Sequence, residues 1–242
     1  MKQRLDQVLA AQGLVASRSQ AESYIKLGQV TVNGRKATKP GQKVAPTDVL
    51  KVQAAHQYVS RAALKLASVA ERLHIQFKDK IMLDVGSSTG GFTQFALQQG
   101  AAKVLAVEVG TNQLHHSLRQ DLRIELHEKT DIRDFKTGQK IDLVVADVSF
   151  ISLRELLPSI KKLCNAQTDL VLMVKPQFEA AADNLKHKGV IKNDKIRREI
   201  LKNFETWVLQ HGFYVVDKAD SDVAGGKGNL ERFYHLKIAS IS

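Results

Sequence analysis

The sequence predicts an α/β protein in two parts: a small α+β module, then a larger domain with a doubly wound, mostly parallel sheet. From residue 81 onward, short apolar runs alternate with helical stretches, as in successive βαβ units. Before residue 61 the predicted elements are shorter and the charge is strongly basic. A chain of 242 residues is long enough for one full-sized domain and a small one. We place these parts at residues 1–53 and 61–242, with a linker at 54–60.

The N-terminal module is predicted to begin with two short helices. Leu5, Val8 and Leu9 recur at the spacing of one buried helical face. The second helix is expected to start at Ser19, because Glu22 follows three positions later, as in a capping box. A glycine at position 28 then marks its end.

A small sheet is predicted after these helices. Apolar residues alternate at positions 30 and 32, and the dipeptide that follows, Asn33-Gly34, is the preferred sequence of a two-residue hairpin turn. A turn at 40–44 and a closing strand at 48–52 complete the module.

Basic residues are concentrated in this module. Residues 1–61 contain 10 Lys and Arg against 3 Asp and Glu, whereas the rest contains 26 against 22, and the whole chain carries a net charge of +11. So small a unit has little core, so these side chains must be mostly solvated. Their excess favours nucleic acid as a partner over a purely solubilising role. The residues predicted to contact it are Arg4, Arg18, Lys26, Arg35, Lys36, Lys39, Lys43 and Arg61.

The larger domain is predicted to contain seven strands, with helices in the gaps between them. The strands fall at residues 81–85, 104–107, 124–127, 143–146, 170–174, 213–217 and 233–238, and the last is expected to be antiparallel. The single cysteine, Cys164, cannot form an internal disulfide and is expected to fill space in the apolar interior.

A glycine-rich turn follows the first of these strands. Its sequence, D-V-G-S-S-T-G-G-F, lacks the lysine of a phosphate loop and does not fit the G-x-G-x-x-G pattern. It resembles the first motif of S-adenosylmethionine-dependent methyltransferases, in which small residues let the backbone approach the cofactor closely. The candidate cofactor-binding residues of this turn are Asp84, Gly86, Ser88, Thr89, Gly90, Gly91 and Phe92.

Two acidic residues follow the next two strands. Glu108 lies 24 positions beyond Asp84, where a carboxylate would bind the ribose hydroxyls of an adenosyl cofactor. Asp131 follows the third strand and could accept a hydrogen bond from the adenine amino group. The alternative interpretation of Glu108 is an exposed strand-end carboxylate, and that of Asp131 is an ordinary turn residue.

Four charged residues form a further candidate site. Asp147 ends the fourth predicted strand and Lys175 ends the fifth, so both lie at the sheet edge where open α/β sheets bind ligands. Lys65 lies on the helix before the first strand, and Glu231 opens the last strand. Each alone is typical of a solvated strand or helix end, whereas the set predicts catalysis.

This order of residues resembles the Lys-Asp-Lys-Glu tetrad of FtsJ-type RNA ribose 2′-O-methyltransferases. The surrounding frames are S-R-A-A-L-K-L, V-A-D-V-S-F, V-K-P-Q-F-E and G-N-L-E-R-F. In the N-terminal module, R-L-D-Q-V-L, S-R-S-Q-A and I-K-L-G-Q-V-T-V-N-G resemble the S4-type RNA-binding domain. The combination is similar to the TlyA family, whose members are also called hemolysins. A departure is T-D at residues 130–131, where T-N is common in that family.

The resemblance implies S-adenosylmethionine as cofactor, ribosomal RNA or a ribosomal subunit as partner, and 2′-O-methylation of a cytidine. Large-subunit RNA is favoured because the chain is short for the family. A ribose hydroxyl is a poor nucleophile, so the reaction needs in-line positioning and help in removing a proton. Lys175 would take or orient that proton, with Lys65 as the nearby cation that makes a lysine a better base. Asp147 would lie near the cofactor sulfur, Glu231 would orient the lysines, and no metal is required.

Other classes of protein fit the sequence less well. The longest apolar run, residues 170–174, is far shorter than the ~20 residues that cross a bilayer, and the N-terminus has no apolar signal core, so we expect a cytoplasmic protein without membrane segments. A pseudouridine synthase would share the first module but not the glycine-rich turn. A pore-forming hemolysin would need membrane-active segments. A non-catalytic RNA-binding protein is favoured only if the four charged residues do not converge.

Overall fold

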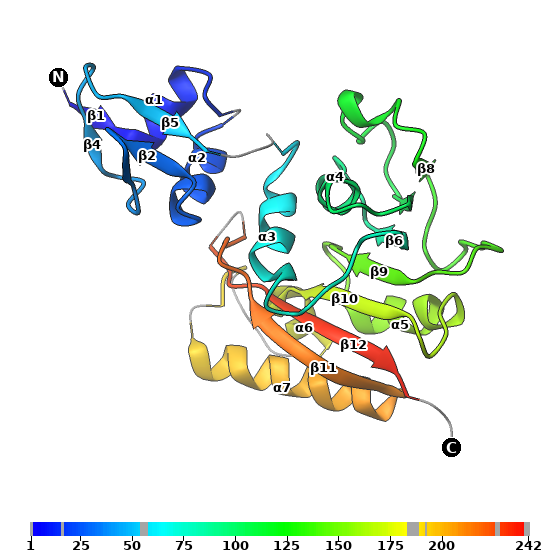
Figure 1. The fold of residues 1–242 in the computed structure, drawn as a ribbon. Helices are drawn as coiled ribbons and strands as arrows, with labels where there is room; N and C mark the ends of the chain where they lie inside the picture. The colour runs from blue at the N-terminus through cyan, green and yellow to red at the C-terminus, as the bar shows by residue number, and fades with distance from the viewer. Residues whose placement is uncertain are drawn as a thin grey trace.

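A computed structural model of the chain describes residues 2–15, 17–53, 58–182, 189–191, 193–225 and 228–239. The N-terminal module and the larger domain lie side by side, with helix α3 (Arg61–Ala70) next to their junction (Figure 1). The predicted linker at 54–60 includes residues 54–57, which lie outside the described residues.

The N-terminal module contains the two predicted helices. Helix α1 spans Leu5–Ala11 and α2 spans Arg18–Lys26. The expected start at Ser19 is wrong, because Ser17 is the N-cap and its Oγ accepts a hydrogen bond from the Gln20 N–H at 3.2 Å. Glu22 is then free to pair with Arg18 at 3.6 Å instead of completing a capping box.

Two small sheets complete this module. Strand β1 (Gln3–Arg4) pairs antiparallel with β4 (Lys43–Val44), and β2 (Val30–Val32) lies between β3 (Arg35–Lys36) and β5 (Leu50–Val52). The predicted hairpin turn is confirmed, because Asn33 and Gly34 have positive φ angles of 51° and 78°, as a type I′ turn requires.

The larger domain is built on one seven-stranded sheet with the order β11-β12-β10-β9-β6-β7-β8. All seven predicted strands are present. Strand β12 runs antiparallel to both its neighbours, so the expected parallel sheet with an antiparallel last strand is confirmed. The strands are β6 (Ile81–Val85), β7 (Lys103–Val107), β8 (Ile124–His127), β9 (Leu143–Ala146), β10 (Asp169–Val174), β11 (Phe213–Asp220) and β12 (Arg232–Ile238).

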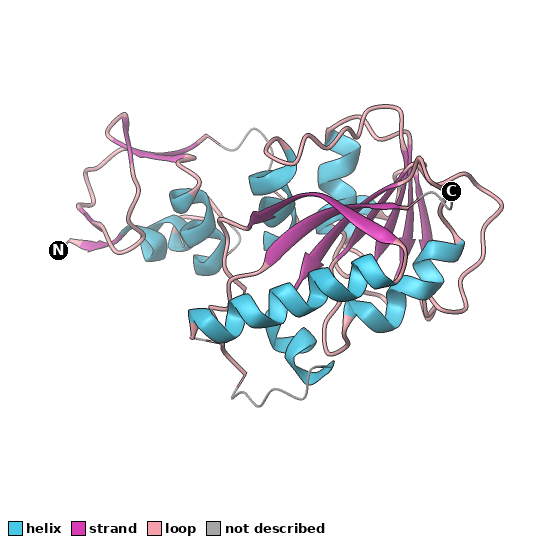
Figure 2. Cartoon of the chain, turned by 90° about the horizontal axis from the view of Figure 1, so that it is seen from below, coloured by secondary structure: helices cyan, strands magenta, loops and turns pink. Residues whose placement is uncertain are grey.

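Helices cover both faces of this sheet (Figure 2). Alternate strand residues supply the two layers: Met82 packs with residues of α3 and α4 (Gly91–Gln98), whereas Leu83 and Val85 pack with α5 (Leu153–Lys162) and α7 (Asp194–Gln210). A short helix, α6 (Pro176–Ala182), follows β10. Among the described residues, no helix combines the length and apolar character that crossing a membrane requires.

The expectation of helices in every gap is wrong at both ends of the sheet. Between β11 and β12, the described residues 221–225 and 228–231 contain no helix. Only a 3₁₀ turn, His116–Leu118, lies between β7 and β8, and residues 128–142, all described, contain no helix. Gly110, Asn112 and Gly138 interrupt any apolar periodicity in these segments. Cys164 packs against the core as expected, although it is only partly buried.

The two parts of the chain share a small apolar core. Leu64 of α3 and Val223, from the loop between β11 and β12, lie in one buried cluster with Leu5, Tyr24 and Ile25 of the N-terminal module. Within the larger sheet, the strand order reverses at β6, with β7 on one side and β9 on the other. Open α/β sheets bind ligands at the carboxyl ends of strands beside such a reversal.

Candidate active site

Two glycines shape the turn after β6. Gly86 has a φ of +77°, and a Cβ there would lie 2.8 Å from the carbonyl oxygen of Asp147. Gly90 has a φ of +88°, and a Cβ there would lie 2.6 Å from methyl groups of Leu114 and Leu118. Its backbone conformation and its packing therefore both favour a glycine at position 90.

Two cavities open at this turn. The larger, of about 440 Å³, is bordered by residues that include Gly86, Ser88, Glu108, Asp131, Asp147 and Phe150. The smaller, of about 230 Å³, is bordered by residues that include Ser60, Arg61, Lys65, Asp84, Thr89, Gly91, Phe92 and Asp147. Gly86, Ser88 and Asp147 border both, so the two cavities adjoin.

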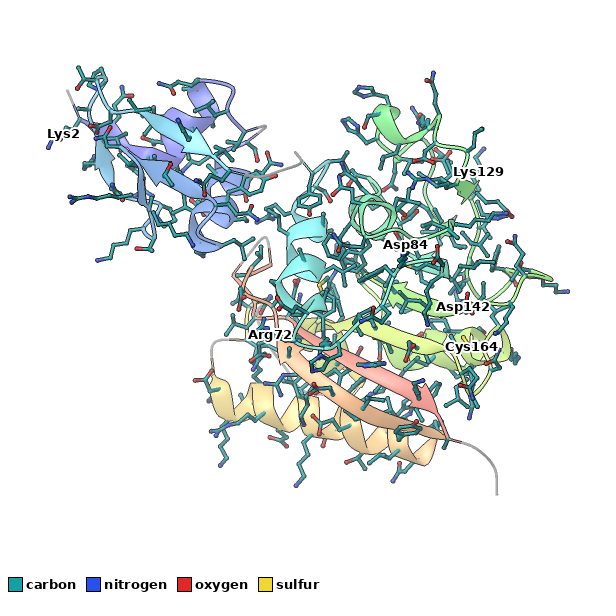
Figure 3. The ribbon with its side chains drawn as sticks, in the orientation of Figure 1. Lys2, Arg72, Asp84, Lys129, Asp142 and Cys164 are labelled. Atoms are coloured by element: carbon teal, nitrogen blue, oxygen red, sulfur yellow. The ribbon has the colours of Figure 1, made fainter. Side chains whose placement is uncertain are left out.

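Asp84 is almost fully buried at the end of β6. Figure 3 shows it in the interior of the larger domain, close to α4. Its Oδ2 accepts a hydrogen bond from Thr93 Oγ1 at 2.6 Å, whereas its Oδ1 has no partner among the described residues. Burial raises the pKa of this carboxyl to about 7, and the Thr93 hydrogen bond offsets only part of that effect. A cationic ligand in the smaller cavity would favour the ionised carboxylate.

Glu108 is buried, so the interpretation as an exposed strand-end carboxylate is wrong. Its Oε2 accepts a hydrogen bond from the Ser88 N–H at 2.9 Å and its Oε1 accepts one from the Gly110 N–H at 2.8 Å. A carboxylate has about four lone-pair directions, so capacity remains for hydroxyl donors. The two backbone bonds hold Glu108 rigidly at the wall of the larger cavity.

Asp131 borders the same cavity but is engaged by a neighbour. Its Oδ1 accepts from Arg133 Nε at 2.9 Å, and its Oδ2 accepts from a terminal nitrogen of that guanidinium at 2.6 Å. These bonds lower the pKa of Asp131. An adenine amino group would therefore have to share this carboxylate with Arg133.

The four residues of the predicted tetrad form two ion pairs. Lys65 Nζ lies 2.5 Å from Glu231 Oε2, and Lys175 Nζ lies 2.6 Å from Asp147 Oδ1. Lys65, Lys175 and Glu231 are buried. Lys65 and Asp147 border the same cavity, so the two pairs meet at one site. Each lysine has its own carboxylate, whereas the sequence suggested that Glu231 would orient both.

The loop that carries Glu231 is held from two sides. Asp220 accepts hydrogen bonds from Arg232 Nε at 2.7 Å and from Arg197 at 2.6 Å. A Cβ at Gly225 would lie 2.7 Å from Glu231 Oε1, so only a glycine allows this close approach. These contacts keep Glu231 directed at Lys65 although the two residues are far apart in the sequence.

Sequence reasoning missed three residues near the tetrad. Ser149 Oγ accepts a hydrogen bond from Lys175 Nζ at 2.8 Å. Phe150 is 92% exposed with a φ of +67°, borders the larger cavity and lies 5.3 Å, ring to ring, from Phe178. Buried Glu179 accepts from the hydroxyl and amide that begin α5. The signal was present in the frames V-S-F and P-Q-F-E, directly after the two strand ends.

The predicted RNA-binding residues lie on several elements of the N-terminal module, except Arg61, which begins α3 of the larger domain. Arg4 and Arg18 both bind the carboxylate of Asp6. Lys26 and Arg61 border a third cavity, of about 220 Å³, between α2 and the larger domain. The remaining four are exposed: Arg35 and Lys36 on β3, Lys39 in the loop that follows, and Lys43 on β4.

Comparison with known proteins finds relatives along nearly the whole chain. The FtsJ-like methyltransferase family matches residues 58–238 and the S4 domain family matches residues 3–50. A Campylobacter jejuni protein named 23S rRNA (cytidine-2′-O)-methyltransferase TlyA is 41% identical, covering 90% of this chain and 93% of that protein. A Mycobacterium tuberculosis protein named 16S/23S rRNA (cytidine-2′-O)-methyltransferase TlyA is 37% identical, covering 97% of this chain and 89% of that protein. The solved structure of a candidate hemolysin from Streptococcus thermophilus is 36% identical, with a TM-score of 0.72, covering 99% of this chain and 89% of that one.

The cavities fit the cofactor of this family. Buried oxygen atoms of Asp84 and Ser87, both bordering the smaller cavity, have no partner among the described residues and suit the polar methionine end of S-adenosylmethionine. Glu108, bordering the larger cavity, suits a ribose diol. Given this fit and matches that span most of the sequence, the chain belongs to the FtsJ-like methyltransferase family, in its TlyA-type branch with an S4 domain, and its cofactor is S-adenosylmethionine.

Proposed function

We propose that this protein methylates the ribose 2′-hydroxyl of a cytidine in ribosomal RNA, and that this cytidine lies in the large-subunit RNA. The observation that carries the proposal is the convergence of two lysine–carboxylate pairs, buried Lys65–Glu231 and partly buried Lys175–Asp147, beside the cofactor cavities. The name of the Campylobacter jejuni relative gives 23S rRNA alone, which supports the choice of subunit, whereas that of the Mycobacterium tuberculosis relative gives both 16S and 23S rRNA. The proposed substrate places the enzyme in the cytoplasm.

Lys175 is the residue best suited to handle the proton of the hydroxyl. When bound, S-adenosylmethionine supplies a methyl group activated by a positively charged sulfur. The attacking ribose oxygen must lose its proton as the new O–C bond forms. Asp147 and Ser149 hold Lys175 Nζ in place, at 2.6 Å and 2.8 Å. Lys175 can pass its own proton to Asp147 or to solvent and accept the hydroxyl proton in its place.

Lys65 and Glu231 would position the ribose. Lys65 borders the smaller cavity, and its ammonium group can donate to a ribose oxygen while it remains paired with Glu231. Holding the oxygen in line with the methyl group removes the orientational part of the barrier. The two lysines therefore have different roles, one acting on the proton and the other on position.

Phe150 would stack on the nucleobase. A bulky residue with positive φ is strained, and an almost fully exposed phenylalanine is unusual in a protein surface. Aromatic side chains commonly stack on unpaired RNA bases. Since Phe150 borders the cofactor cavity at the turn after Asp147, a base stacked on it would bring its ribose to the tetrad.

The cofactor would lie across both cavities. We assign its ammonium group to Asp84, its ribose to Glu108 and its adenine to the region of Asp131. The turn at residues 86–91 would contact the cofactor through its backbone. The N-terminal module would bind the surrounding RNA through its basic residues.

The proposal is tested by mapping 2′-O-methyl groups on ribosomal RNA from cells with and without the gene. We expect one or more cytidine sites to disappear in the deletion and to return with the wild-type gene but not with a Lys175→Ala variant. An unchanged map, together with RNA binding by the purified protein, would favour the non-catalytic alternative. Lysis of protein-free liposomes by the purified protein would favour the hemolysin alternative.

A further inference from the structure

The N-terminal module contains a buried carboxylate in the middle of its basic residues. The side chain of Asp6 has no exposed surface. Its Oδ1 accepts from Arg4 Nε at 3.0 Å, and its Oδ2 accepts from Arg4 Nη2 at 2.9 Å and from Arg18 Nε at 2.8 Å. Asp6 therefore binds two of the predicted RNA-binding arginines at once.

A carboxylate at this position opposes the binding of phosphate, so its presence needs a reason. Burial would by itself raise the pKa of Asp6, but the hydrogen bonds from Arg4 and Arg18 outweigh burial and lower the pKa to about 2. The group is thus ionised at every pH at which the protein works. Its negative charge weakens the long-range attraction of the module for RNA. Its hydrogen bonds, however, fix the positions of the Arg4 and Arg18 side chains.

Both arginines keep donors available on the outer side. The side chain of Arg4 is 37% exposed and that of Arg18 is 51% exposed. A guanidinium has five N–H donors, and the bonds to Asp6 use two on Arg4 and one on Arg18. The free edges of the two groups remain able to bind phosphate oxygens while their inner edges are fixed.

A third cation lies beside this pair. Arg4 and Lys43 are directly opposite each other in the antiparallel β1–β4 ladder, so their side chains share one face. The Leu5 N–H donates to the Gln42 carbonyl at 2.8 Å, which fixes the loop before β4 against the start of α1. Figure 1 shows β1 and β4 at the end of the module farthest from the larger domain.

We propose that Asp6 organises Arg4 and Arg18 into a single phosphate-binding fork, with Lys43 at its side, that holds the RNA backbone at a point remote from the reacting nucleotide. This inference rests on the proposed RNA substrate. Asp6 is a positioning residue that fixes the arginine rotamers before RNA arrives, so less side-chain entropy is lost on binding. Because β1 and β4 lie at the end of the N-terminal module farthest from the larger domain (Figure 1), the RNA must be large or folded to reach both the fork and the tetrad.

The test compares two variants that remove one negative charge each. The dissociation constant of the full-length protein for protein-free 23S rRNA is measured over a series of salt concentrations. If Asp6 acted only as a charge, Asp6→Asn would bind RNA more tightly. The fork predicts that the dissociation constant rises by about fivefold or more, because a charge-assisted hydrogen-bonding arrangement is lost. The slope of log affinity against log salt should change little, since both arginines remain.

Glu22→Gln is the matched control. Glu22 contacts the same arginine, Arg18, at 3.6 Å, but on the exposed surface. Its removal should leave the dissociation constant unchanged or lower it. Arg18→Ala should weaken binding and reduce the salt slope by about one unit, as expected for one lost phosphate contact. Equal or tighter binding by Asp6→Asn would overturn the fork.

Misfolding is separated from loss of the fork by repeating Asp6→Asn in an Arg4→Ala, Arg18→Ala background. The fork predicts that Asp6→Asn then costs no affinity, because there are no arginines left to position. An equal loss in both backgrounds would show that Asp6 supports only the fold and would overturn the proposal. If the wild-type protein does not bind 23S rRNA, the proposed function itself fails, which is a different outcome from wild-type binding with an unaffected Asp6→Asn variant.

Discussion

Lys175 Nζ lies 2.6 Å from Asp147 Oδ1, and the two residues directly follow the ends of the neighbouring parallel strands β10 and β9. Asp147 borders both cavities, so this ion pair of the tetrad lies next to the region proposed for the cofactor. Parallel strands bring such residues together because their carboxyl ends meet at one edge of the sheet. The ends of these two strands thus set the position of Lys175, and Ser149 from the loop after β9 adds a hydrogen bond.

Lys175→Ala should abolish methyl transfer while leaving cofactor affinity close to that of the wild type. Loss of a general base commonly costs ~10²–10⁴-fold in rate, and lost positioning adds to that. Lys175→Arg should fail almost as badly, since a guanidinium keeps the charge but does not give up its proton near neutral pH. Single-turnover methylation assays and calorimetric titration of the cofactor measure the two effects. Substantial activity in the arginine variant would leave Lys175 as a positioning cation and point to Asp147 or water as the proton acceptor.

The Lys65–Glu231 pair should behave as a coupled unit in stability measurements. Removing either partner leaves a buried charge without compensation, which costs about 3 kcal/mol of unfolding free energy. The double variant Lys65→Met, Glu231→Gln leaves no such charge and should be more stable than the sum of the single losses predicts. Urea unfolding of the four proteins gives the coupling energy. Strictly additive losses would mean that the two side chains do not interact in solution.

Asp84 should make stability depend on pH. Burial raises its pKa to about 7 in the folded protein, compared with about 3.9 in an unfolded chain. Between these two values the unfolded state releases a proton that the folded state keeps, so the contribution of Asp84 to stability falls as pH rises through this window and is constant above it. Asp84→Asn should remove that slope. Unfolding curves of both proteins at several pH values give the slope of unfolding free energy against pH. Identical slopes in the wild type and in Asp84→Asn would contradict this role of Asp84.

Cofactor affinity should follow the ionisation of the same carboxyl. A cofactor ammonium group favours the ionised form, so affinity should fall about tenfold per pH unit below the pKa and level off above it. Asp84→Asn should bind the cofactor more weakly and without this dependence. Calorimetric titrations on both sides of that pKa decide the matter. A wild-type affinity that is flat across the range would place the ammonium group elsewhere.

Gly86→Ala should weaken cofactor binding, whereas Gly138→Ala should not. A Cβ at Gly86 would lie 2.8 Å from the Asp147 carbonyl oxygen in a backbone conformation that favours glycine, so Asp147 must move. Nothing lies within 4 Å of a Cβ at Gly138. We expect a loss of about tenfold or more in affinity for the first variant, as for other strained backbone substitutions, and wild-type behaviour for the second. Equal affinities would mean that the turn adapts.

The central strands of the larger domain could be predicted because they are compact apolar runs. Ile81–Val85 and Leu143–Ala146 were predicted with the bounds that the structure has. The start of α2 was predicted wrongly because two serines near it are both suitable N-cap residues. Ser17 and Ser19 can both cap α2, and only tertiary context chooses Ser17.

The residues of the candidate site were easier to predict than the pairs that they form with one another. Lys65 and Glu231 pair because β12 inserts between β10 and β11, a sheet order that no local pattern reveals. The frame V-S-F contains Phe150, but its exposure could not be predicted, because a phenylalanine after a strand is normally buried and its positive φ is set by the turn. In the N-terminal module, Arg4 and Arg18 were predicted as freely solvated cations, yet Asp6 holds both.

The most direct test of the central claim is methyl transfer from labelled S-adenosylmethionine to an RNA whose target cytidine has been replaced by 2′-deoxycytidine. The site is first located by comparing ribosomal RNA from cells with and without the gene. We predict that the purified protein labels the ribose form and leaves the 2′-deoxy form unlabelled, because the accepting oxygen is absent. Equal labelling of both forms would show that the methyl group goes to the base and would contradict the proposed reaction.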